Sequence, residues 1–247
     1  MAETTGISWC RSTWNPWIGC TEVSPGCDHC YARELDKRHR WGGALHWGAG
    51  VPRMRTAAST WKQPLTWNRK AAASGERWTV FPSLCDPFDN EVPEEWRNDF
   101  WHLIHTTPAL TWLLLTKRIG NAAKMIPWSE HAWPNVWIGS SVVNQEEADR
   151  DIPKLLAVPA AKRFLSLEPM LEPIYISPTR GISWAIVGGE SNQGKFKARP
   201  FDLAWARSVR DQCKAAGVPC FIKQDSGKSG AQGRFTDEEW AIKEFPT

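Results

Sequence analysis

Short apolar runs, separated by polar turns and by helix-like stretches, recur along the chain. Most of these runs are apolar at consecutive rather than alternate positions, which favours strands that are buried on both faces of a sheet. We predict six clear strands and a seventh that directly precedes the first cysteine of a cluster. They are Trp78–Leu84, Thr111–Lys117, Val136–Val142, Arg163–Pro169, Trp184–Glu190, Pro219–Gln224 and, as the seventh, Thr13–Gly19.

Helix-like segments lie between the predicted strands. The segment Val92–Thr107 has a proline and acidic residues near its start, followed by apolar residues at helical spacing. A second begins at Asn144, and a third runs from Asp202 to Gly217; these residues are favourable caps. Alternation of strand and helix is typical of repeated βα units around a parallel sheet. We therefore expect one α/β domain over 1–247, either a partial or complete TIM-like barrel or a doubly wound sheet.

Composition narrows the class of protein. The chain has 247 residues, of which 42% are hydrophobic and 23% charged, as in ordinary globular domains. It has no uninterrupted apolar run of about 18 residues, so we expect no membrane span. The N-terminal stretch lacks a basic segment followed by an apolar one, so we expect no secretory signal and a cytoplasmic location.

The predicted strands end on polar or charged residues, which parallel strands would bring to one edge of the sheet. This pattern predicts a polar cavity there. The strand-end residues are Ser83, Asp86, Thr116, Lys117, Arg118, Ser140, Ser141, Ser166, Glu168, Gly188, Gly189, Glu190, Ser191, Lys223 and Gln224.

Three of the seven cysteines, Cys20, Cys27 and Cys30, lie close together with the spacing C-x6-C-x2-C. A structural zinc ion needs four ligands, which His29 or His39 would have to complete. Three thiolates can instead hold a 4Fe–4S cluster and leave one iron open to a substrate or cofactor. Unmodified thiols are a third interpretation. The single cysteines Cys85, Cys213 and Cys220 lie in apolar or helical patterns, and we interpret them as buried packing residues.

Charge is spread unevenly along the chain. The formal net charge is +3, but the stretch 33–77 has ten basic and three acidic residues and so carries +7. Four of the 17 tryptophans lie within it. Basic side chains neutralise phosphates and aromatic rings stack on unpaired bases, so this stretch predicts DNA or RNA binding by an insertion. Packing of the aromatic rings under a solvated basic loop is the alternative. The candidate residues are Arg38, Arg40, Trp41, Arg53 and Arg55.

The three-cysteine loop resembles that of radical S-adenosylmethionine enzymes, which carry three cysteines after the first strand of a partial βα barrel. Their usual spacing is C-x3-C-x2-C, and the first gap here is longer. His29 occupies their aromatic position before the last cysteine. Segments such as "TWNPWIGCTEVSPGCDHCYA", "RFLSLEPMLEPI" and "WAIVGGES" are similar to those of the phage-associated three-Cys-motif family, a domain of unknown function, and the similarity covers nearly the whole chain. It implies a radical-SAM-like barrel with a cluster on the three cysteines.

The same resemblance suggests roles for other strand-end residues. In radical SAM enzymes a Gly-Gly-Glu segment contacts the amino group of the cofactor, and Gly188, Gly189 and Glu190 repeat these letters after a later strand. A plain glycine turn is the alternative. The remaining candidates are His29, Ser140 and Lys223 for cofactor binding and Glu168 and Lys117 for catalysis. Glu168 at a strand end needs a partner, for which Lys117 or Lys223 is available.

Two functions follow from these patterns. The first is a radical-SAM-like enzyme that uses a 4Fe–4S cluster and S-adenosylmethionine on a nucleic acid or nucleotide. The alternative is a nucleic-acid-binding protein without catalysis, whose iron–sulfur cluster, or zinc, is structural or redox-sensing. This alternative requires a fourth protein ligand, for which His29, His39 and Cys10 are candidates.

Overall fold

The computed structural model describes residues 1–177 and 179–247. Seven strands form one parallel sheet, and two short strands pair in an antiparallel ribbon. The strands of the parallel sheet are β1 Ser12–Thr13, β4 Trp78–Phe81, β5 Leu110–Thr116, β6 Val136–Ser141, β7 Lys162–Leu167, β8 Trp184–Gly188 and β9 Cys220–Gln224. The ribbon consists of β2 Trp17–Ile18 and β3 Met54–Arg55.

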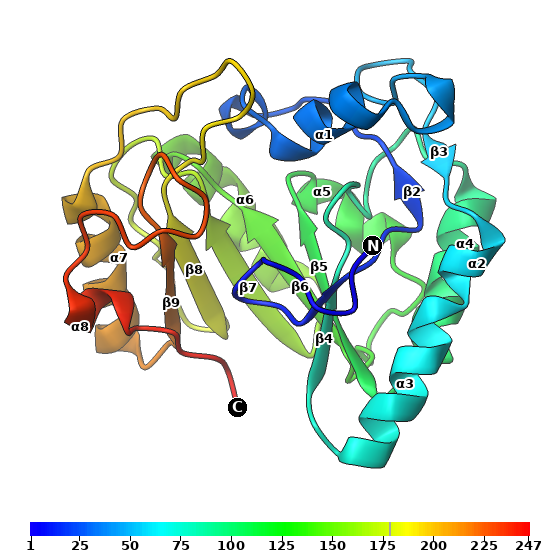
Figure 1. The fold of residues 1–247 in the computed structure, drawn as a ribbon. Coiled ribbons are helices and arrows are strands. Elements are labelled where there is room, and N and C mark those ends of the chain that lie inside the picture. The colour runs from blue at the N-terminus through cyan, green and yellow to red at the C-terminus, as the bar shows by residue number, and fades with distance from the viewer. Residues whose placement is uncertain (178) are drawn as a thin grey trace.

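The parallel sheet is curled into a half-barrel (Figure 1). Each strand pairs with the next strand of the sheet along the chain, in the order β1-β4-β5-β6-β7-β8-β9. The edge strands β1 and β9 do not pair with each other within the described parts of the chain, so the barrel is open. This confirms the predicted α/β class with parallel strands, in the form of a partial barrel.

The predicted strand Thr13–Gly19 is divided in two. The chain leaves the main sheet after β1, and β2 pairs with β3 instead. Pro16 lies between the two strands and has no N–H to donate to a ladder. Its carbonyl oxygen accepts a hydrogen bond from the Thr56 amide at 3.1 Å. The segment thus turns away from the barrel just before the cysteines.

Helices connect the strands and cover the convex face of the sheet (Figure 1). The three segments predicted as helices form α4, α6 and α7. The α-helices are α1 Tyr31–His39, α2 Ala58–Trp61, α3 Gln63–Ser74, α4 Glu94–His105, α5 Ile119–Met125, α6 Gln145–Ala157, α7 Leu203–Ala216 and α8 Asp237–Trp240. Two short 3₁₀ helices, η1 Pro25–Cys27 and η2 Trp41–Gly43, flank α1. No helix in the described residues is long and apolar enough to span a bilayer.

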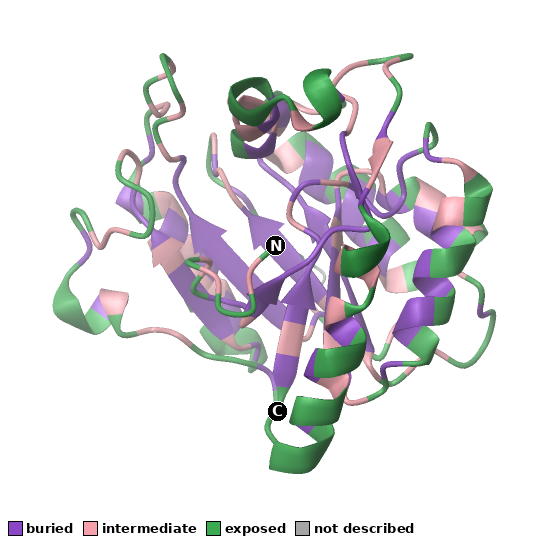
Figure 2. Cartoon of the chain, turned by 45° about the vertical axis from the view of Figure 1, so that its right-hand side comes forward, coloured by how far each residue is buried: buried purple, intermediate pink, exposed green. Residues whose placement is uncertain are grey.

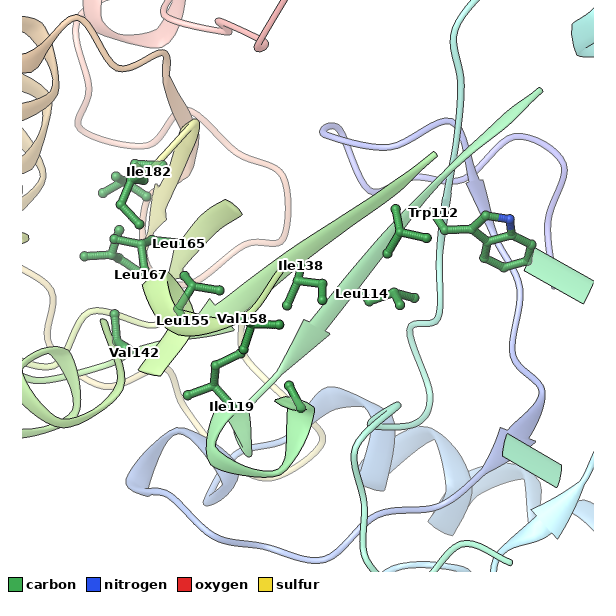
Figure 3. Packing of buried hydrophobic residues seen from close by; sticks show 14 of the residues in the cluster. Trp112, Leu114, Ile119, Ile138, Val142, Leu155, Val158, Leu165, Leu167 and Ile182 are labelled. Atoms are coloured by element: carbon green, nitrogen blue, oxygen red, sulfur yellow. The ribbon is translucent and has the colours of Figure 1, made fainter. Parts of the chain in front are cut away.

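The main core lies between the sheet and these helices. In Figure 3, Ile119 from α5 and Leu155 from α6 lie near Ile138 and Leu165 from the sheet. All four side chains are at most 1% exposed. The burial of such side chains stabilises the fold by about 1.5–3 kcal/mol each. This layer holds the strands rigidly and so positions their ends.

The concave face carries a second, mostly aromatic core. Phe164 and Trp184 point inward from alternate positions of the sheet. Trp9, from the N-terminal segment, packs against them with ring centroids 6.4 and 6.2 Å away. This plug fills the interior toward the amino ends of the strands. Space for chemistry is therefore left at the carboxyl ends.

The basic stretch 33–77 is only partly an insertion. It contains α1, η2, β3, α2 and α3. Of these, α3 is the crossover helix before β4, and its Trp67 stacks on Trp78 of that strand at 6.3 Å. Figure 2 shows α3 with a buried stripe toward the sheet and an exposed one toward solvent. The stretch thus completes the first βα unit and also covers the carboxyl edge with α1 (Figure 1).

Candidate functional site

A cavity of about 140 Å³ lies at the carboxyl ends of β4, β5 and β6. All three clustered cysteines line it, as do Lys117, Arg118 and Ser141 from the strand ends. The sequence prediction of a polar cavity at this edge is therefore met for the first half of the barrel. Cys85 lines the same cavity, although the sequence alone led us to interpret it as a packing residue.

Each loop cysteine is placed by a different local structure. Cys20 follows Gly19, whose φ of 119° and close approach to the His46 carbonyl oxygen exclude a side chain. Cys27 ends η1, and the preceding turn is capped by the Ser24 hydroxyl, which accepts from the Gly26 amide at 3.0 Å. Cys30 is the N-cap residue of α1, where the helix dipole favours a thiolate.

Arg118 is the cation nearest to the thiols. Its Nη1 lies 3.3 Å from Cys20 Sγ and 3.1 Å from Asp86 Oδ2, and its side chain is only 8% exposed. Asp86 also accepts hydrogen bonds from the Thr116 hydroxyl at 2.7 Å and the Phe88 amide at 2.9 Å. Asp86 therefore both caps its turn and holds the arginine toward Cys20.

Lys117 reaches into the same cavity from the end of β5. Its Nζ donates to the Ser141 hydroxyl at 3.0 Å. The structure gives it no carboxylate partner among the described residues, so its charge is available to the cavity. Ser140, the serine that the sequence prediction selected, does not line this space. It lies on the same side of β6 as Ile138, toward the helices, and its hydroxyl is buried without a partner in the described chain.

The cavity environment acts on the thiols. Burial, together with the charge of Asp86, outweighs Arg118 and raises the pKa of Cys20 to about 12. Burial likewise raises the pKa of Cys30. Metal ligands are thiolates, so the binding of a metal centre would displace these protons and be favoured by rising pH.

The arrangement of the thiols bears on the identity of the metal. No three His, Cys, Asp or Glu side chains of the described residues converge on one point that would hold a single ion. Thiolates that share one zinc ion lie roughly 4 Å apart. The three loop cysteines instead surround a cavity, which fits the larger, sulfide-bridged core of a cluster better than one zinc ion.

The second half of the barrel edge is closed by ion pairs. Glu168 at the end of β7 pairs with Lys223 of β9, which is the partner that the structure selects from the two predicted. Neither residue lines the cavity of the cysteines. Both are less than one-fifth exposed, so their charges mainly neutralise each other.

Glu190 is bound on several sides. Arg199 donates to it through its amide and through Nε and Nη2, at 2.9–3.0 Å. His29 Nδ1 lies 3.1 Å from Glu190 Oε1, and the His29 ring stacks on Phe196 at 4.8 Å. Burial raises the pKa of Glu190, but the Arg199 hydrogen bonds and charge lower it more, so that it lies below its usual value. These contacts tie the cysteine loop to the end of β8.

The two glycines before Glu190 are explained by packing. A Cβ at Gly189 would lie 2.5 Å from Ser226 Oγ and 2.7 Å from the Ser226 amide nitrogen. One at Gly188 would lie 3.2 Å from the Gln224 carbonyl oxygen. The backbone that approaches these glycines belongs to β9 and the loop after it. In this structure the segment thus serves strand packing and the clamp on His29.

The predicted nucleic-acid residues are distributed between surface and interior. Arg38 and Arg40 are exposed and Trp41 is half-buried, stacked on His39 at 5.0 Å. Arg53 is fully buried and pairs with Asp89 at 2.8 Å, so it supports the fold and is not part of a surface. Arg55 pairs with Asp99 at 2.7 Å and lies over the Trp61 ring. The exposed candidates are therefore Arg38, Arg40 and Trp41.

These features define a partial βα barrel with a cysteine-lined cavity at the carboxyl edge of its sheet. The family described as "Protein of unknown function (DUF5131)" matches residues 4–240, and the chain belongs to it. Comparison with curated proteins and with solved structures gives no match.

Proposed function

We propose that this protein holds a 4Fe–4S cluster on Cys20, Cys27 and Cys30 and is a radical-SAM-like enzyme that acts on a nucleic acid or nucleotide. The observation that carries the proposal is the convergence of three cysteines on one cavity at the edge of a partial parallel barrel. Parallel βα folds place their reactive groups at this edge.

The chain's own residues prepare the thiols. Arg118, held by Asp86, lies against Cys20 Sγ and offsets the negative charge of its thiolate. The amino end of α1 does the same for Cys30. Lys117 adds a third positive group that faces the cavity. A bound cluster with S-adenosylmethionine on an open iron would supply one-electron cleavage of the sulfonium and thereby hydrogen abstraction from a substrate.

The proposed partner is recognised through phosphate charge and base stacking. Arg38, Arg40 and Trp41 are accessible at the end of α1, the helix that lies over the barrel edge. Lys195, Lys197 and Lys228 are exposed on the loops that follow β8 and β9, with no carboxylate partner in the described residues. Cations on both sides of the edge would hold a single strand across the cavity.

Anaerobic reconstitution followed by chemical analysis tests the cluster and the reaction. We expect iron and sulfide to be incorporated, and dithionite with S-adenosylmethionine to yield 5′-deoxyadenosine and methionine. Incorporation without cleavage would favour the non-catalytic alternative. Zinc in place of iron and sulfide, in protein purified without oxygen, would overturn the cluster itself.

Nucleic-acid binding is tested with matched arginine variants. Arg38→Ala/Arg40→Ala should weaken binding of a single-stranded oligonucleotide and lower the slope of log affinity against log salt by about 2, one for each lost phosphate contact. Arg69→Ala removes an equally exposed arginine from α3 and serves as the control. Equal losses in the two proteins would show that the α1 end is not the binding surface.

A further inference from the structure

A fourth thiol faces the space that the cysteine loop surrounds. Cys85 lies four residues beyond the end of β4 and lines the same cavity as Cys20, Cys27 and Cys30. Gly19 and Cys85 lie opposite each other in a parallel bridge, and the Gly19 amide donates to the Leu84 carbonyl oxygen at 3.1 Å. The two chain segments that carry Cys20 and Cys85 are thus hydrogen-bonded neighbours.

The surroundings of Cys85 differ from those of the packing cysteines. Cys213 and Cys220 are 0% and 3% exposed in the convex core. Cys85 is half-buried, and within the described chain its sulfur has one polar contact, a weak one to Asn15 Oδ1 at 3.9 Å. A thiol with little packing and little hydrogen bonding, on the wall of a cavity, retains its capacity to bind a ligand.

The other candidates for a fourth ligand lie elsewhere. His29 is bound between Glu190 and Phe196, and His39 is exposed and stacked on Trp41. Cys10 is buried in the aromatic core of the concave face. None of these three lines the cavity, so Cys85 is the cysteine or histidine that the fold adds to the loop's three cysteines within the described residues.

We propose that Cys85 is the fourth protein ligand of the metal centre, bound in the resting state to the iron that the loop cysteines leave free. The inference rests on the proposed cluster. Four thiolates give such a centre net negative charge, and Arg118 and Lys117 on the cavity wall offset it. A sulfonium cofactor would then reach the iron only where the Cys85 thiolate is released, so Cys85 controls access to the open site.

Small-ligand binding to the reconstituted protein tests this assignment. The proteins compared are wild type, Cys85→Ala, Cys85→Ser and Cys213→Ala, the last being a buried cysteine outside the cavity. Each is reduced with dithionite, and its electron paramagnetic resonance spectrum is recorded with and without cyanide, a ligand for an open iron. Circular dichroism of the metal-free proteins checks that each variant folds.

We expect cyanide to leave the spectra of wild type and Cys213→Ala unchanged and to shift those of Cys85→Ala and Cys85→Ser, at similar iron and sulfide content. An equal cyanide shift in wild type and Cys85→Ala would overturn the inference and leave the three-cysteine cluster intact. Failure of every variant and of wild type to incorporate iron and sulfide would instead overturn the proposed function, and this inference with it. If Cys85→Ala does not fold, the Cys85→Ser protein decides between these outcomes.

Discussion

The carboxyl edge of the sheet has two halves of different character. Around β4, β5 and β6, thiols and the Lys117 ammonium surround an open cavity. Around β7, β8 and β9, the carboxylates of Glu168 and Glu190 are already paired with Lys223 and Arg199. Both halves carry polar residues at strand ends, as the sequence predicts. Only the first half keeps bonding capacity for a ligand, because a carboxylate saturated by an internal arginine or lysine has little left to offer.

The comparison therefore separates residues that would bind a ligand from residues that hold the edge in shape. Loss of a residue in the first half should remove a ligand or leave a buried charge without a partner. Loss of a residue in the second half should cost stability and leave the metal content unchanged. Four substitutions test this difference.

The largest effect is expected for Cys27→Ala. Thiolates hold the cluster, so iron and sulfide content after anaerobic reconstitution should fall by at least about tenfold. Cys213→Ala, in the convex core, should retain the content of wild type. Equal iron and sulfide in the two variants would remove the basis for assigning the first half to metal binding.

Arg118→Met should be the most destabilising change to the metal-free protein. It leaves Asp86, whose side chain is 7% exposed, without its cation, and breaking a buried pair costs about 3 kcal/mol or more. Urea unfolding measures the loss. The double variant Asp86→Asn/Arg118→Met should lose less, and Lys70→Met, which breaks an exposed pair with Glu3, should lose less than about 1 kcal/mol. Equal effects of Arg118→Met and Lys70→Met would contradict the buried role.

Gly189→Ala should destabilise the second half without touching the metal site. Its new Cβ would meet the Ser226 backbone, which has no rotamer by which to move away, and we expect a loss of about 2 kcal/mol. Iron and sulfide content should stay at the wild-type level. Gly6→Ala, which has nothing within 4 Å of its Cβ position, is the control. A fall in cluster content with unchanged stability would instead point to a ligand-binding role for Gly189.

Glu190→Gln should have the smallest effect, about 1 kcal/mol near neutral pH, and should change the response to acid. The folded-state pKa of Glu190 lies below its usual value of about 4.5, so its stabilisation is complete above that value and is lost as pH falls through the folded pKa. The unfolding free energy of wild type and variant, measured from neutral to acidic pH, should therefore converge at low pH. A constant difference across this range would show that Glu190 acts through packing.

Local sequence signals predicted most of the fold. The runs at Thr111–Lys117 and Trp184–Glu190 lie close to β5 and β8, because buried parallel strands have an unambiguous apolar pattern. The seventh strand was placed less well, since Pro16 divides it and only pairing with β3 shows where the second piece goes. Arg53 was assigned to a surface because composition cannot show that Asp89, 36 residues away, would bury it.

The sequence by itself determined that the chain forms βα units, that polar residues end its strands and that three cysteines lie in one loop. These properties depend on residues near one another in the chain. The tertiary structure decided which strand-end charges cancel and which fourth cysteine joins the loop. Cys85 lies 65 residues after Cys20, and it reaches the cavity because β1 and β4 pair in parallel and bring both chain segments to the same edge of the sheet.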